Sequence, residues 1–179
     1  MIILTAVGPD RPGMAHALAQ VLADAECNLE DTTMTRLAGE FAMILIVTPP
    51  ETMSLEQLQA QLSPLEKSHN LFINSRMIPD ETALLASGGA EQLPRFMVSA
   101  YGAERSGLLA KLTGVFATYN VNITDVQSRV ASHGTVYVML FEVQLPPGLE
   151  AQALQDELEK VAQQIGVTVN LRPLEEDTL

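Results

Sequence analysis

The stretch Gly8-Pro9-Asp10-Arg11-Pro12-Gly13 follows an apolar run and precedes a helical pattern, and it recurs 94 residues later as Gly102-Ala103-Glu104-Arg105-Ser106-Gly107. The same offset continues without a gap into the helix and strand that follow the loop. It relates Ala6/Ala100, Leu18/Leu112, Val21/Val115, Ala23/Ala117, Asn28/Asn122 and Asp31/Asp125. A chance match of one short loop would not extend this far, so the sequence predicts an internal duplication.

The length of 179 residues suits two domains, each of a size at which a small domain folds alone. We expect the first domain at residues 1–80 and the second at 94–179. Residues 81–93 between them lack a hydrophobic period, and the pair Gly88-Gly89 favours a flexible linker.

Hydrophobic periodicity predicts the same order of elements in each repeat: strand, helix, strand, strand, helix, strand. In the first repeat the expected strands are 2–7, 29–37, 41–47 and 71–78, and the expected helices are 14–25 and 55–65. In the second the expected strands are 96–101, 123–130, 135–145 and 167–171, and the expected helices are 108–119 and 154–165. The predicted fold class is α+β: two ferredoxin-like βαββαβ sandwiches, each with an antiparallel four-stranded sheet and helices on one face.

The segment 41–47 is apolar at nearly every position, which is typical of a strand buried on both faces. The uncovered face and the edge of a four-stranded sheet are also places where another copy can pair. We therefore expect the sheets to associate, within the chain or across a dimer, and the chain to form a homodimer.

The charge of the chain argues against one class of partner. The chain contains ten Lys and Arg and 22 Asp and Glu, which gives a net charge of -12, and the basic residues are scattered singly. Such a chain repels a phosphate backbone, so no direct binding to nucleic acid is expected.

The location expected from the sequence is cytoplasmic. No apolar run is long enough to cross a bilayer, and the first seven residues lack the basic start of a signal peptide. Cys27 is the single cysteine, which rules out an intrachain disulfide.

The repeated loop has features of a binding site for a small zwitterion. A glycine at a helix start brings backbone amides to the surface, where the positive end of the helix dipole favours a carboxylate. Asp10 and Glu104 offer a carboxylate to an ammonium group, and Asn28 and Asn122 could add an amide oxygen. Another reading stays open, in which the glycines serve only a tight turn and the asparagines only begin a strand.

The motif Gly-x-Asp-Arg-Pro-Gly after the first strand, with Asn about 15 residues after its second glycine, resembles that of the ACT domain, a regulatory module that binds amino acids. The resemblance covers both halves. In that family the ligand sits between the first loop, the start of the first helix and a neighbouring domain's second strand. The resemblance implies these ligand-binding residues: Gly8, Asp10, Arg11, Pro12, Gly13, Met14, Asn28, Gly102, Glu104, Arg105, Ser106, Gly107, Leu108 and Asn122. Ser106 departs from the motif, because it replaces the proline.

A free-standing tandem pair of this kind is similar to the glycine cleavage system transcriptional repressor family. That similarity implies a repressor or antiactivator that senses a small amino acid, with glycine as the candidate. It also implies that the protein acts by contact with a DNA-bound transcription activator. The alternatives are a detached regulatory subunit of an amino-acid-metabolising enzyme and a scaffold without a ligand.

No enzyme class fits the residues. Cys27 has no histidine near it in sequence, and His16, His69 and His133 lack the spacing of metal ligands. We therefore expect no catalytic residues, no metal site and no cofactor.

Overall fold

The computed structural model of the chain describes residues 1–78, 93–103, 106–131 and 136–174. The chain divides into two compact units, Met1–Gly89 and Ala90–Leu179. The linker expected at 81–93 lies outside the described residues except for Leu93. No helix of the described ranges is long and apolar enough to cross a membrane.

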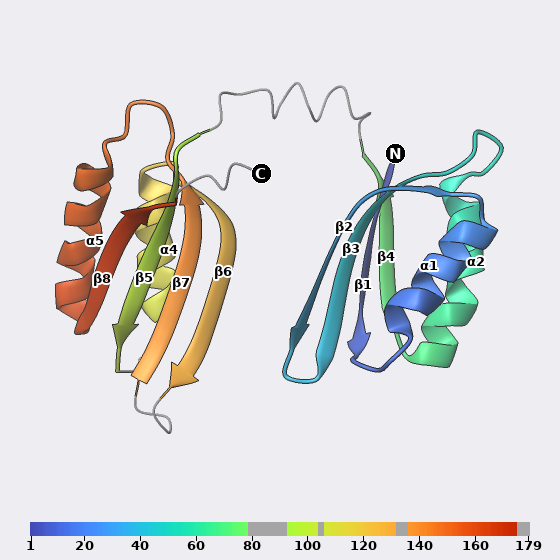
Figure 1. Ribbon diagram of the computed structural model, residues 1–179, viewed down its shortest axis with the longest axis horizontal. Coiled ribbons are helices and arrows are strands. Elements are labelled where there is room, and N and C mark those ends of the chain that lie inside the picture. Colours follow the sequence, from blue (N-terminus) through green and yellow to red (C-terminus); the bar gives the residue numbers. More distant parts are fainter. Residues whose placement is uncertain (79–92, 104–105, 132–135, 175–179) are drawn as a thin grey trace. The chain divides into compact units, whose positions relative to one another are not determined.

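The first unit is a four-stranded sheet with two helices on one face (Figure 1). Its elements are β1 (Ile2–Pro9), α1 (Met14–Asp24), β2 (Asn28–Leu37), β3 (Glu40–Thr48), α2 (Leu55–His69) and β4 (Phe72–Met77). The strand order is β2-β3-β1-β4, and neighbouring strands are antiparallel. Since β1 and β2 both pair with β3, they run in the same direction on either side of it.

The second unit has the same architecture. Its elements are β5 (Arg95–Gly102), α4 (Leu108–Thr118), β6 (Asn122–Ala131), β7 (Val136–Gln144), α5 (Ala151–Ile165) and β8 (Val167–Pro173). The strand order is β6-β7-β5-β8, again antiparallel. The predicted pair of ferredoxin-like βαββαβ sandwiches is confirmed.

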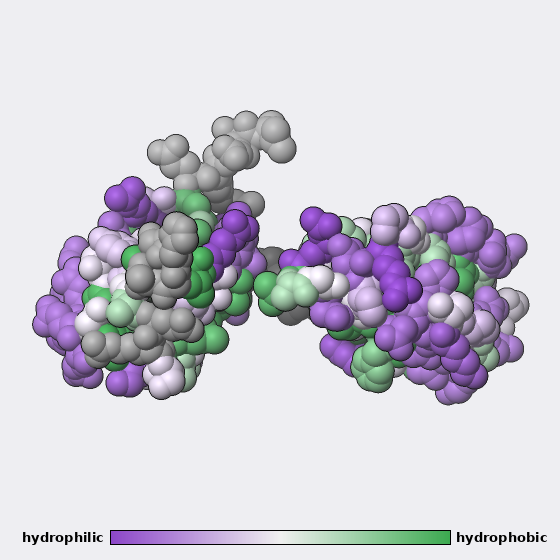
Figure 2. Space-filling model, turned by 90° about the horizontal axis from the view of Figure 1, so that it is seen from below, coloured by the Kyte–Doolittle hydropathy of each residue, from purple (hydrophilic) through white to green (hydrophobic). Residues whose placement is uncertain are grey.

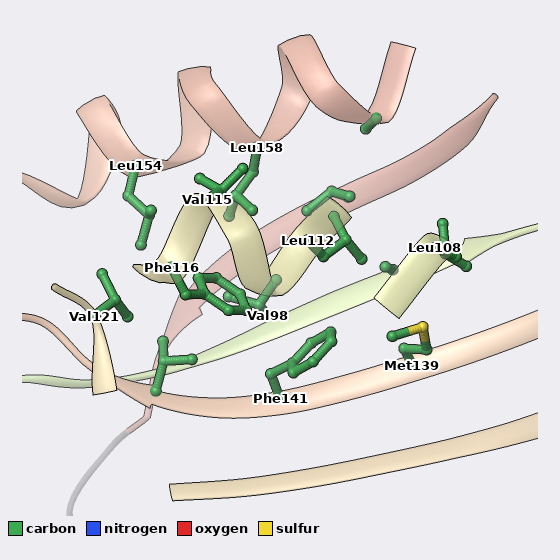
Figure 3. Close-up of a cluster of buried hydrophobic side chains, with 14 of the residues drawn as sticks. Val98, Leu108, Leu112, Val115, Phe116, Val121, Met139, Phe141, Leu154 and Leu158 are labelled. Atoms are coloured by element: carbon green, nitrogen blue, oxygen red, sulfur yellow. The ribbon is translucent and has the colours of Figure 1, made fainter. Parts of the chain in front are cut away.

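Each core lies between one face of the sheet and its two helices. In the second unit Phe116 of α4 packs edge-to-face on Phe141 of β7, with ring centroids 5.3 Å apart. Leu112 and Leu158 bring the two helices onto the same cluster (Figure 3). The first unit has an equivalent core around Leu18 of α1, and its buried residues alternate along β1 and β3.

The helices of the first unit cover one face of β3. Phe41 and Leu45 are buried against the helices, whereas Ile44 is 41% exposed. Successive side chains of a strand point to opposite faces, so Ile44 belongs to the other face of the sheet. Burial of 41–47 on both faces would require a partner on that other face, and it stays a prediction.

Glycine begins the first helix of each unit. Gly13 and Gly107 precede α1 and α4 with φ of 93° and 82°, in the left-handed region that other residues rarely adopt. By contrast α2 begins with a capping box: the Ser54 hydroxyl accepts a hydrogen bond from the amide of Gln57 at 3.2 Å, and the Gln57 side chain accepts one from the amide of Ser54 at 2.7 Å.

On one edge of each sheet a helix side chain occupies a backbone amide of the edge strand. The carboxylate of Glu66 on α2 accepts a hydrogen bond from the amide of Ile73 on β4 at 3.0 Å. In the second unit Gln155 of α5 accepts one from the amide of Leu171 on β8 at 2.8 Å. Among the described residues, no other element bonds to the backbone of the opposite edge strands, β2 and β6, on their outer side.

Candidate functional site in the first unit

The loop between β1 and α1 is tied to the β2–β3 hairpin. The amide of Asp10 donates a hydrogen bond to the carbonyl of Gly39 at 2.8 Å. This bond fixes the backbone of the loop beside the end of β2, so the side chains of the loop and of β2 share one surface.

The two glycines of the loop have different roles. A Cβ added to Gly8 would lie 2.7 Å from the carbonyl oxygen of Asn70, so this glycine allows β1 to approach the turn before β4. Gly102 is equally crowded, since a Cβ there would lie 2.8 Å from the Cγ1 atom of Val167. Space around Gly13 is open, and its positive φ is what calls for glycine. Gly8 therefore serves packing, while Gly13 shapes the helix start.

The first turn of α1 leaves backbone donors free for a ligand. The amide of Met14 donates to the carbonyl of Arg11 at 3.3 Å, and that of Ala17 to Gly13 at 2.8 Å. The amides of Ala15 and His16 have no acceptor among the described residues. Such amides at a helix N-terminus favour an anion.

A charged pair stands beside these amides. The Nη1 group of Arg36 on β2 donates a hydrogen bond to the Oδ2 atom of Asp10 at 3.0 Å. The Arg36 side chain is 67% exposed and the Asp10 side chain 29% exposed. Because a guanidinium has five donors and a carboxylate several lone pairs, both groups keep capacity for further bonds.

A surface cavity of about 520 Å³ joins the amides and the charged pair. Its lining residues are Asp10, Arg11, Gly13, Met14, Ala15, His16, Met34, Arg36 and Phe41. Figure 2 views the first unit from the end that carries this loop, where the surface is largely hydrophilic with separate hydrophobic areas. The cavity thus offers amides, a carboxylate, a guanidinium and apolar side chains within one space.

The structure brings together only some of the residues that the sequence indicated. Asp10, Arg11, Gly13 and Met14 line the cavity. Pro12 is an exposed residue of the same loop. The structure adds residues that the sequence reasoning missed: Ala15, His16, Met34, Arg36 and Phe41. The alternation of β2 could have indicated Met34 and Arg36, because both lie on its helix-side face opposite Met43 and Phe41.

Asn28 does not line this cavity. It pairs with Thr48 at the start of β2, beside the level of Ile2, whereas Gly8 pairs with Phe41 at the other end of the sheet. At about 3.3 Å per strand residue the two levels are about 20 Å apart. The Asn28 side chain donates instead to Glu30 at 2.8 Å.

The corresponding loop of the second unit is described only in part. Glu104 and Arg105 lie outside the described residues. Ser106 and Gly107 are exposed, and Leu108 is buried in the core. Asn122 lies at the far end of β6 from Gly102 and donates to Gln144 at 3.2 Å.

Other chemistry-bearing groups lie apart from the cavity. Cys27 is half-buried, and burial raises the pKa of its thiol. Among the described residues, no three His, Cys, Asp or Glu side chains gather closely enough to hold a metal ion. A smaller cavity of about 190 Å³ lies between α2 and β4, where Gln59 donates to Ser75 at 2.8 Å and Glu66 bonds the edge of the sheet.

Known proteins share both the fold and the sequence pattern. A crystal structure of a protein from Galdieria sulphuraria superposes with a TM-score of 0.75 at 22% identity, covering 97% of this chain and 98% of that one. A second, provisionally assigned as a glycine cleavage system transcriptional repressor, superposes with a TM-score of 0.73 at 18% identity, covering 98% and 97%. At these identities the likeness shows the fold alone.

Sequence relatives extend the comparison. The chain is 30% identical over 78 residues to a UPF0237 protein of Methanosarcina mazei, covering 44% of this chain and 84% of the relative. It is 22% identical over 129 residues to the glycine cleavage system transcriptional repressor of Escherichia coli K12, covering 72% of this chain and 64% of the repressor. The ACT domain family matches residues 1–75 and 95–172, which is most of the chain. The protein therefore belongs to the ACT domain family, with one ACT domain in each unit.

Proposed function

We propose that this protein is a non-catalytic, cytoplasmic regulator that binds an α-amino acid in the cavity of its first unit and passes the signal on by protein contact. One observation carries the proposal. The charged pair of Asp10 and Arg36 and the free amides of Ala15 and His16 belong to one cavity. An α-amino acid carries the complementary charges on neighbouring atoms.

The two ends of the ligand would be recognised by different groups. The ligand carboxylate accepts hydrogen bonds from the amides of Ala15 and His16 and from the guanidinium of Arg36. The ligand ammonium donates to the carboxylate of Asp10. The ligand leaves the ion pair of Asp10 and Arg36 intact. Each of the two protein charges therefore gains a second partner of opposite charge and keeps the first.

The lining also bears on the ligand's side chain. Met14 and Phe41 form a buried floor, and Met34 is 51% exposed at the side. A thioether adapts its shape and can cover an apolar side chain, a contact that glycine cannot make. The repressor relative draws attention to glycine, whereas the lining favours a longer apolar amino acid, so both belong in the same titration.

The partner that we propose is a DNA-bound transcription activator. The net charge of -12 disfavours direct contact with DNA, so a regulator of transcription with this charge would act through another protein. The likeness to the Escherichia coli repressor supports this direction. Capture from a cell extract tests it: a transcription regulator supports the proposal, and an amino-acid-metabolising enzyme supports a detached regulatory subunit instead.

A homodimer would give Asn28 a place in the site. If two copies pair antiparallel along their open β2 edges, the start of one β2 lies beside the end of the other. Asn28 of the partner subunit would then approach Arg36 and the loop of this chain. A dimer in solution that Leu37→Arg disrupts supports this arrangement, because Leu37 lies at the end of β2 and is 76% exposed.

Calorimetric titration with each of the twenty amino acids tests the proposed ligand class. We expect heat with at least one of them, and its loss in Asp10→Asn and Arg36→Val. The absence of heat with all twenty overturns the proposal. If both variants retain binding, the amino acid binds at another site of the protein.

A further inference from the structure

We infer that each chain binds a single amino acid, in the first unit. Arg36, which the second unit replaces by another residue at the matching strand position, is the residue that limits binding to the first unit. The inference rests on the proposed function and concerns the stoichiometry and the binding residue of the same site. It comes from comparing the two units position by position, since they share one topology.

The position of Arg36 is defined by the register of the sheet. In the first unit Gly8 pairs with Phe41, and Phe41 pairs in turn with Arg36. In the second unit Gly102 pairs with Tyr137, which pairs with Val130. Val130 therefore occupies the place of Arg36, and the sequence offset of 94 gives the same answer.

The difference extends along the strand. The helix-side face of β2 near the loop carries Met34 and Arg36, which both line the cavity. The matching positions of β6 are Ser128 and Val130, as the pairing with Met139 and Tyr137 shows. The nearest arginine of β6, Arg129, belongs to the opposite face, because successive strand residues alternate. The described part of β6 thus supplies no cation on the side of the loop.

A ligand at the second loop would lack the guanidinium that Arg36 supplies in the first unit. A charged carboxylate that leaves water without this partner loses solvation that a charge-assisted hydrogen bond would otherwise replace. The loop itself has structural reasons to persist without a ligand. Gly102 lets β5 approach Val167, and Gly107 begins α4 at a φ of 82°. Duplication therefore kept both glycines in each unit, whereas among the described strand positions the guanidinium of the charged pair is present only in the first.

The test is calorimetric titration of the full chain with each of the twenty amino acids, recording the number of molecules bound per chain. We expect one per chain. Arg36→Val, which installs the residue of the second unit, should weaken binding at least tenfold, the loss of one charge-assisted contact. Arg36→Lys retains the charge and should weaken it less. Arg129→Val removes an arginine from the other face of β6 and should leave the affinity unchanged.

The outcomes separate the inference from the proposed function. Two molecules bound per chain, or one molecule whose affinity Arg36→Val leaves intact, overturns the inference while the amino-acid sensor stands. No binding of any amino acid overturns the sensor and this inference with it. Circular dichroism of each variant checks that the fold is retained, which the exposure of Arg36 leads us to expect.

Discussion

The carboxylate of Asp10 accepts a hydrogen bond from the guanidinium of Arg36 at 3.0 Å, although the two residues are 26 positions apart and Asp10 follows β1, which does not pair with the strand of Arg36, β2. The strand between them, β3, fixes their distance through its register with both neighbours. A loop that begins a helix is thereby joined to an edge strand. The consequence is a cavity whose ion pair joins two different parts of the chain.

Replacing Asp10 by Asn should separate binding from stability. The Asp10–Arg36 pair is partly exposed, so its loss should cost no more than about 1 kcal/mol of unfolding free energy. The neutral amide no longer attracts an ammonium group, so amino-acid affinity should fall at least tenfold by calorimetry. An unchanged affinity would show that the ammonium group binds elsewhere.

Met34→Ser should alter selectivity among ligands. The change gives β2 the residue of the second unit at this position and removes an apolar wall of the cavity. Amino acids with long apolar side chains should lose affinity, while glycine should bind as before. Met77→Ser is the matched control, because Met77 is 59% exposed on β4 and does not line the cavity. Equal effects of the two substitutions on affinity contradict a role for Met34.

Alanine at the two loop glycines should distinguish their roles. Gly8→Ala places a Cβ 2.7 Å from the carbonyl oxygen of Asn70, a backbone atom that cannot turn aside, and should destabilise by about 3 kcal/mol. The Cβ of Gly13→Ala has no neighbouring atom within contact distance. The only loss of unfolding free energy is therefore that of placing alanine in the left-handed region, about 1 kcal/mol. Urea unfolding measures both. A larger loss of unfolding free energy for Gly13→Ala than for Gly8→Ala would mean that the turn before β4 shifts at little cost to accommodate the added Cβ.

Cys27 should react slowly with alkylating reagents. Burial raises the pKa of its thiol, so at a given pH less of the reactive thiolate is present than in the unfolded chain. The rate of reaction with iodoacetamide should therefore rise at higher pH in the folded protein than in urea. Coinciding pH profiles would indicate that the thiol is fully solvated.

The sequence was sufficient to predict the elements and their order. Periodicity is a local property, and it placed every helix and strand of both units close to its observed range. The capping box of α2, which joins Ser54 and Gln57, is a finer feature that periodicity does not specify. The box requires a side chain three residues after the cap, which is a matter of helix geometry.

The site was predicted only as far as local sequence reaches. Asp10 and Gly13 were found because the loop is contiguous. Arg36 was missed because its meeting with Asp10 depends on two strand registers, which the sequence does not display. Because β1 and β2 run in the same direction, the start of β2 lies far from the loop that follows β1 within a unit. A role of Asn28 in the site therefore requires another subunit and stays a prediction.

The hydrogen bonds from Ile73 to Glu66 and from Leu171 to Gln155 have a consequence for assembly. A sheet that can accept a new strand on either side can grow without limit, as fibrils do. When a helix side chain already occupies a backbone donor of one side, a new strand cannot form a full ladder there. Association along the remaining side is then favoured and ends with a symmetric dimer, so continued strand addition is disfavoured for that sheet.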